Sequence, residues 1–141
     1  MTQHILIGVA WPYANGPLHL GHLAGCYLSA DVFARYHRLK GNSVLMVSGS
    51  DQHGTPITLR AESEGITPDE VVAKYHASFL DCWQRMGISF DLFTTTGTAN
   101  HRRVVHDMFL RLYKQGYIYK DVMKVAYTPE FRRYLPDRYV Q

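Results

Sequence analysis

Short apolar runs alternate with long segments of helical periodicity along this chain, and this alternation constrains the fold more than any other feature. Residues 5–10 and residues 44–47 are continuous apolar runs, which are typical of strands buried on both faces of a sheet. Between them, apolar residues recur at helical spacing from Leu20 to Ala34, and Gly41 can end that helix in a left-handed conformation. Because a long helix connects the two runs, we predict parallel strands joined by a right-handed crossover.

The segment after the second run repeats this pattern. A short helix is predicted to begin near residues 55–56 and to stop at Gly65. Thr67 can cap the next helix, and Glu70 can reach back to complete a capping box, so a long helix is predicted from here to Gly87. A third strand is predicted at residues 90–94.

The last third of the chain is predicted to hold one more helix and two strand-like stretches. The helix runs from about residue 100 to 115, and its apolar stripe is Val104, Val105, Met108 and Leu112. The strand-like stretches are residues 117–119 and 122–127. The alternation of strands and helices indicates an α/β fold with a parallel sheet and flanking helices, of which three units make only half of a doubly wound sheet.

Composition excludes several classes of protein. No apolar run approaches the roughly 20 residues that span a bilayer, and the N-terminus lacks the pattern of a secretory signal, so we expect a cytoplasmic protein with no membrane partner. Cys26 and Cys82 lie within helical patterns and lack zinc-knuckle spacing, so buried reduced thiols are expected. The net charge of +3 permits an anionic partner without requiring one.

Two polar loops follow the first two predicted strands. They cover residues 11–22 and residues 48–54. Because parallel sheets bind ligands at the carboxyl ends of their strands, we expect both loops to open on a single crevice.

The first of these loops favours phosphate. His19 and His22 are three residues apart, so they project from one side of a helix start, where the helix dipole and N–H groups also attract anions. Gly21 leaves room for a base or ribose to approach closely. A metal site and a surface without function are the alternatives, and a metal is disfavoured because no third ligand is obvious nearby.

The second loop favours a cationic group. Asp51 ends a buried strand and could bind a substrate ammonium, or it could merely cap the following helix. For His53, bracing the loop is the preferred interpretation over contact with substrate.

Longer strings in these loops resemble the methionyl-tRNA synthetase family of class I aminoacyl-tRNA synthetases. His19-Leu20-Gly21-His22 resembles the signature of class I aminoacyl-tRNA synthetases. This tetrapeptide alone is only moderately specific, because nucleotidylyltransferases carry a similar His-x-Gly-His sequence. The resemblance becomes specific with Pro-Tyr-Ala-Asn-Gly at residues 12–16 and Gly-Ser-Asp-Gln-His-Gly-Thr-Pro-Ile at residues 49–57. Residues 135–140 resemble the stretch that leads into that family's zinc-bearing insertion.

The resemblance implies a fold and a reaction. Residues 1–117 would be the first half of a Rossmann-like catalytic domain, and residues 118–141 the truncated start of a connective insertion. The full-length ligase would activate methionine with ATP and Mg²⁺ to methionyl-adenylate, and would then transfer the aminoacyl group to tRNA(Met). Its structural zinc would have ligands outside this chain, so no metal ligand is expected within it.

The resemblance also implies roles for single residues. His19 and His22 match the catalytic histidines that bind ATP, and Gly21 and Asn15 match further ATP-binding positions. The positions matching the methionine site are Ala10, Trp11, Tyr13 and Asp51. Trp11 stands where the family more often has leucine, which puts the shape of the methionine pocket in doubt.

The family's Lys-Met-Ser-Lys-Ser loop is absent from these residues. We therefore expect the chain to be inactive alone. Because only half of the sheet is present, we also expect an exposed sheet edge through which the chain self-associates. Two other functions compete: a small nucleotidylyltransferase that is active as it stands, and a non-catalytic assembly module that binds protein or RNA without nucleotide.

Overall fold

The computed structural model describes residues 2–130 and 132–134. The chain falls into two compact units, residues 1–104 and residues 105–141, which are described separately below.

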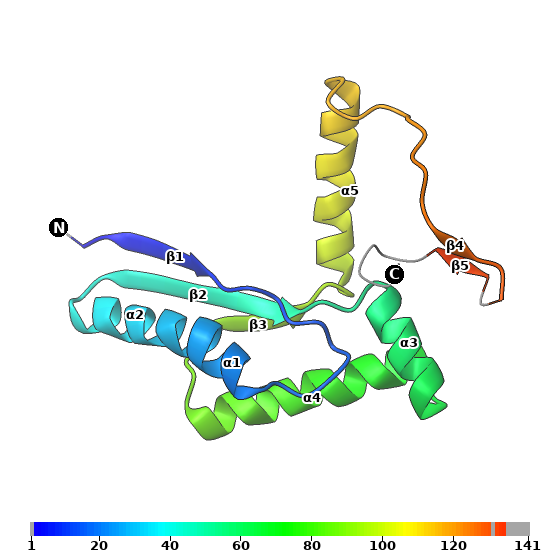
Figure 1. The fold of residues 1–141 in the computed structure, drawn as a ribbon. Helices are drawn as coiled ribbons and strands as arrows, with labels where there is room; N and C mark the ends of the chain where they lie inside the picture. Colours follow the sequence, from blue (N-terminus) through cyan, green and yellow to red (C-terminus); the bar gives the residue numbers. More distant parts are fainter. Residues whose placement is uncertain (1, 131, 135–141) are drawn as a thin grey trace. The chain divides into compact units, whose positions relative to one another are not determined.

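The first unit is built on a parallel sheet, as the sequence predicts. Its strands are β1 (His4–Gly8), β2 (Ser43–Ser50) and β3 (Leu92–Thr95), in the order β1-β2-β3 (Figure 1). Ile5 pairs with Val44, and Val47 pairs with Leu92. β1 ends two residues before the predicted limit at residue 10, because the chain turns there into the first polar loop.

The first crossover is one continuous helical segment with a change of geometry inside it. It consists of α1 (Leu20–His22), the π-helical turn η1 (Leu23–Tyr27) and α2 (Leu28–Leu39). Such wide turns often occur near functional sites. Gly41 follows with a φ of 79°, which is the left-handed ending that the sequence predicts.

The second crossover consists of α3 (Thr55–Glu64) and α4 (Pro68–Met86). The predicted capping box is present: Thr67 Oγ1 accepts a hydrogen bond from the Glu70 N–H, and the Glu70 carboxylate accepts one from the Thr67 N–H. Gly65 and Gly87 end the two helices with left-handed conformations. These local signals therefore predict both helices correctly.

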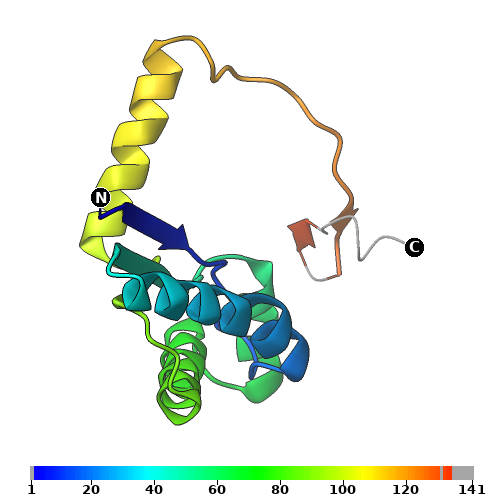
Figure 2. The same cartoon turned by 90° about the vertical axis from the view of Figure 1, so that its left-hand side faces the viewer.

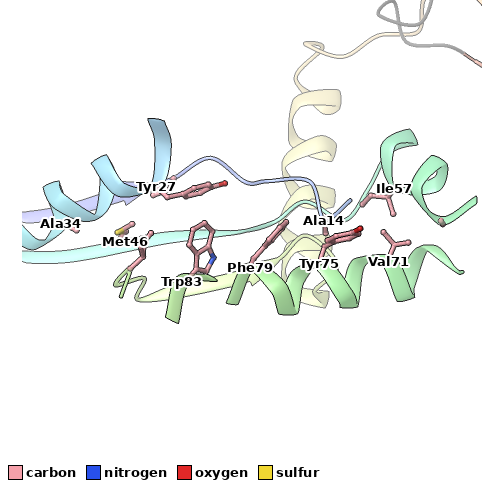
Figure 3. Packing of buried hydrophobic residues seen from close by; sticks show 12 residues of the cluster. Ala14, Tyr27, Ala34, Met46, Ile57, Val71, Tyr75, Phe79 and Trp83 are labelled. Atoms are coloured by element: carbon pink, nitrogen blue, oxygen red, sulfur yellow. The ribbon is translucent and has the colours of Figure 1, made fainter. Parts of the chain in front are cut away.

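The core of the first unit lies between the sheet and α4. Figure 3 shows the α4 side chains pointing toward residues of the sheet, the first crossover and α3. The buried residues of α4 are Val71, Tyr75, Phe79 and Trp83. Tyr27 packs its ring 4.5 Å from that of Trp83, which joins the two crossovers in one aromatic cluster.

The expectation that the strands are buried on both faces is wrong for the described residues. Figures 1 and 2 show α2 and α4 on the same side of the sheet. Both crossovers are expected to be right-handed, and both lead to the next strand in the order β1-β2-β3, so their helices lie on one face of the sheet. On the other face Leu6 is 69% exposed, Leu45 50% and Leu92 53%. The burial along β1 therefore alternates, with Ile5 and Ile7 facing the helices.

The second unit departs more from the predictions. α5 (Ala99–Lys114) crosses the boundary between the units, and all four residues of its predicted apolar stripe are at least 36% exposed. The predicted strands at 117–119 and 122–127 are wrong except at Tyr127, because residues 117–126 have no strand partner to satisfy their backbone groups. Instead β4 (Tyr127–Thr128) pairs antiparallel with β5 (Arg133–Tyr134).

Cys26 and Cys82 are free thiols, as predicted. They are only half-buried, so the prediction that both are buried is wrong. Burial raises the pKa of the Cys82 thiol, which keeps it in the unreactive protonated form. Within the described residues, no helix has both the length and the hydropathy to cross a bilayer.

Candidate functional site

Backbone hydrogen bonds tie the two polar loops together beyond the ends of their strands. Tyr13 and Asp51 form an isolated parallel bridge. The Ala14 N–H donates to the Asp51 carbonyl at 3.0 Å, and the Asp51 N–H donates to the Pro12 carbonyl at 2.8 Å. The loops therefore leave the same edge of the sheet side by side, as the position of their strands predicts.

The Asp51 carboxylate has two inequivalent oxygens. Oδ1 accepts hydrogen bonds from the His53 N–H at 3.3 Å and from Thr96 Oγ1 at 3.4 Å. Oδ2 has no hydrogen-bond donor among residues 2–130 and 132–134. The alternative interpretation of Asp51 as a helix cap is wrong, because Gly54 is the N-cap of α3 and has no side chain to cap with.

Thr96 is a site residue that the sequence analysis missed. Its hydroxyl accepts a hydrogen bond from the Gln52 N–H at 2.9 Å, and its own N–H donates to the Ser50 carbonyl at 3.2 Å. Thr96 directly follows β3, so it lies at the same carboxyl edge of the parallel sheet as the two polar loops.

The contact between Ser50 and His76, which the sequence analysis also missed, holds the end of β2. Ser50 is fully buried, and its Oγ lies 2.7 Å from Nδ1 of His76 on α4. The His76 ring stacks 5.7 Å from the ring of Phe93, and burial lowers the pKa of the imidazole. A neutral His76 thus holds the residue that precedes Asp51.

His19 and His22 cap each other. The His22 N–H donates to His19 Nδ1 at 3.3 Å, and the His19 N–H donates to His22 Nδ1 at 3.4 Å. The two rings stack with their centroids 3.7 Å apart. Because a backbone N–H can only donate, both Nδ1 atoms are acceptors and both Nε2 atoms carry a proton. The pair therefore presents two exposed Nε2–H donors, which suit an anion.

The structure gives a second reason for a glycine at position 21, in addition to the space that it leaves for a nucleotide. A Cβ at this position would lie 3.0 Å from Nδ1 and Cε1 of His19. The missing side chain therefore lets the His19 ring fold back over the helix start and stack on His22.

The start of the first loop is anchored to the core. The Ala10 carbonyl accepts hydrogen bonds from the Tyr27 hydroxyl at 3.2 Å and from Ser48 Oγ at 3.1 Å. The half-buried Trp11 lies over Gly49, where a Cβ would be 2.6 Å from Cζ3 of the indole. The large side chain at position 11 is thus accommodated by a glycine on the adjacent strand.

The remaining predicted residues of this loop lie further out. Tyr13 is 47% exposed, and Asn15 is half-buried. The ring of His101, at the start of α5, lies 5.9 Å from that of Trp11 and adds a residue the sequence analysis did not single out.

Two of the hollows lined by described residues border the loops, and each of these touches only one loop. One of about 420 Å³ is lined partly by Pro17, Leu18 and Leu23, and the other of about 410 Å³ partly by Gln52, His53 and Arg102. Neither is lined by His19, His22 or Asp51. The predicted single crevice therefore stays a prediction, supported by the backbone pairing of the loops. Among the described residues, no three His, Cys, Asp or Glu side chains are grouped to hold a metal ion.

Curated proteins similar to this chain are methionine–tRNA ligases. The chain is 61% identical over all 141 residues to the Dehalococcoides mccartyi (strain 195) enzyme, of which it covers 26%. It is 62% identical over 141 residues to that of Roseiflexus sp. strain RS-1, of which it covers 24%. The chain thus spans about a quarter of the length of these relatives.

Solved structures agree with this fold. Mycobacterium tuberculosis methionyl-tRNA synthetase in complex with methionyl-adenylate matches 100% of this chain and 27% of that one, with a TM-score of 0.84 and 26% identity. Agrobacterium radiobacter K84 agnB2 LeuRS, in a ternary complex with tRNA and LeuAMS, matches 99% of this chain and 18% of that one, with the same TM-score and identity. The predicted Rossmann-like synthetase fold is confirmed. Since the family model described as tRNA synthetases class I (M) also matches residues 5–141, the chain belongs to the class I tRNA synthetases.

Proposed function

We propose that this chain forms the part of a methionine–tRNA ligase that binds methionine and ATP. The observation that carries the proposal is the Tyr13–Asp51 bridge, because it holds a candidate ammonium-binding carboxylate beside the loop that leads to the histidine pair. Identity of about 60% to methionine–tRNA ligases over the whole chain supports the same amino acid. The complete reaction belongs to the complete gene product, since the chain spans about a quarter of those relatives.

In the proposed first step, the methionine carboxylate attacks the α-phosphorus of ATP, which is bound as its Mg²⁺ complex. An oxygen–phosphorus bond forms to give methionyl-adenylate, and the bond to pyrophosphate breaks. No enzyme nucleophile takes part, so the protein contributes position and charge stabilisation. In the second step, a hydroxyl of the terminal adenosine of tRNA(Met) attacks the activated carbonyl and releases AMP.

The histidine pair and Asp51 have separate roles in this proposal. The Nε2–H groups of His19 and His22 donate to phosphoryl oxygens as negative charge builds there. Oδ2 of Asp51 accepts from the methionine ammonium, while Oδ1 stays bound within the protein. Trp11 and Tyr13 line the amino-acid side, and Asn15 and Gly21 the nucleotide side. The predicted cytoplasmic location fits this role and stays a prediction.

Methionine-dependent exchange of pyrophosphate into ATP by the complete gene product tests the proposal. Exchange is expected with methionine and is expected to be far weaker with leucine, isoleucine, valine or cysteine. His22→Ala and Asp51→Ala should each lower it on the order of 100-fold or more. Unchanged exchange in both variants would refute the site, and preference for another amino acid would refute the substrate.

A separate assay distinguishes the proposed function from its competitors. The 141-residue chain is incubated with ATP and phosphopantetheine, and pyrophosphate release is measured. Release would favour a nucleotidylyltransferase over a ligase, whereas no release together with methionine-dependent exchange by the complete gene product supports the ligase.

A further inference from the structure

The Thr96 hydroxyl has one hydrogen-bond acceptor among the described residues. Its oxygen already accepts the Gln52 N–H at 2.9 Å, so the hydroxyl proton must point elsewhere. The nearby acceptor is Oδ1 of Asp51 at 3.4 Å. This contact is long for a hydrogen bond between oxygens.

Together with the His53 N–H, Thr96 supplies Oδ1 with two donors while Oδ2 has none in the described part of the chain. A carboxylate held by one oxygen cannot rotate freely about its terminal torsion, so the other oxygen keeps one direction. The protein thus distinguishes two atoms that are chemically equal.

From these contacts we infer that Thr96 is a positioning residue for methionine binding, which orients Asp51 so that Oδ2 faces the substrate ammonium. This inference rests on the proposed function and adds to it the residue that directly follows the third strand. The Thr96 backbone is itself fixed, because its N–H donates to the Ser50 carbonyl. The hydroxyl is therefore presented from the sheet edge rather than from a free loop.

Energetically, Thr96 prevents the carboxylate from sampling orientations that cannot bind. A hydrogen bond of this kind contributes modestly, and its loss corresponds to about a fivefold weaker interaction with the ammonium. The effect should fall on methionine alone, because the ATP contacts come from the histidine pair. A change confined to the KM of one substrate separates positioning from a general loss of structure.

The experiment compares variants of the complete gene product in methionine-dependent pyrophosphate exchange. Thr96→Val removes the hydroxyl at nearly constant shape, and Thr96→Ala removes it without adding bulk. Each should raise the KM for methionine about fivefold and leave the KM for ATP unchanged. Thr96→Ser keeps the hydroxyl and should restore most of the methionine affinity.

Thr94→Val is the matched control, because Thr94 is half-buried on β3, two residues before Thr96, and its hydroxyl makes no hydrogen bond to a described residue. It should behave as the wild type. In an Asp51→Asn background, Thr96→Val should add little, since its partner is already altered.

A methionine KM within twofold of the wild type in both Thr96→Val and Thr96→Ala would overturn the inference. Equal increases for methionine and ATP, with no rescue by Thr96→Ser, would also overturn it, because they indicate a purely structural role. Absence of methionine-dependent exchange in the wild type would instead overturn the proposed function, and this inference with it.

Discussion

His19 and His22 each accept the backbone N–H of the other at Nδ1 while their rings stack 3.7 Å apart. This reciprocal cap uses the inner nitrogen of each ring for structure and leaves the outer nitrogen for a ligand. It also occupies the His22 N–H, so this N–H is not among the helix-start donors that were expected to attract anions. Phosphate recognition is therefore expected to come from the imidazole edges.

His19→Asn separates these two uses of the imidazole. An asparagine oxygen can accept the His22 N–H as an N-cap, but the amide group of this shorter side chain does not reach the position of Nε2. We predict that pyrophosphate exchange by the complete gene product falls on the order of 100-fold while its melting temperature changes little. A fall of less than threefold would show that the outer nitrogen of His19 is not used.

Gly49→Ala is predicted to destabilise the sheet. The new Cβ would lie 2.5 Å from the Thr94 carbonyl oxygen and 2.6 Å from Cζ3 of Trp11, so β3 and the indole must both move. We expect a loss of about 1–3 kcal/mol in the free energy of unfolding, measured by urea denaturation. Gly8→Ala on β1 is the control, since a Cβ there meets nothing within 4 Å. Equal stability of the two variants would contradict the close packing.

His76 is predicted to make stability depend on pH. Burial lowers its pKa in the folded protein below the ordinary 6.5, so the unfolded chain takes up a proton first as the pH falls. The contribution of His76 is therefore present above pH 6.5 and is lost as the pH falls through the lowered pKa.

His76→Asn provides the comparison, because its amide can still hydrogen-bond Ser50 but does not titrate. The free energy of unfolding, measured from neutral to mildly acidic pH, should decrease less steeply in the variant than in the wild type. If the free energy of unfolding depends on pH equally in the variant and in the wild type, burial does not disfavour the charged form of His76.

The 141-residue chain by itself is predicted to self-associate. The outer edges of β1 and β3 are unpaired among the described residues, and Leu6 and Leu45 form part of an exposed apolar face. Light scattering across a dilution series should show a mass above that of the monomer, and Leu6→Lys should reduce it. Leu39→Lys changes a leucine on α2 that is more exposed than Leu6, and it should have less effect. A monomer with a sharp two-state unfolding transition would contradict this prediction.

Signals confined to a few neighbouring residues predict the structure well. The Thr67–Glu70 capping box and the left-handed Gly65 and Gly87 depend only on local backbone geometry, and all are present. The parallel direction of the strands also follows from local patterns, because a helical segment connects each strand to the next.

Features that depend on distant partners are missed. Thr96 contacts Asp51 at a sequence separation of 45 residues, and His76 contacts Ser50 at a separation of 26. No periodic pattern in the sequence predicts either contact. The strand-like stretch at 117–119 fails for the opposite reason: its composition suits a strand, but a strand also needs a neighbour to pair with.

The Tyr13–Asp51 bridge has a consequence for how this site can vary. Two paired backbones can change register only by whole residues. The position of the Asp51 carboxylate at the sheet edge is therefore set by strand register and not by the length of either loop. Residues inserted between Ala14 and His19 would move the imidazoles and leave Asp51 where it is. The two halves of the site are thus free to diverge separately, with the amino-acid half held by the sheet and the nucleotide half adjustable by the loop.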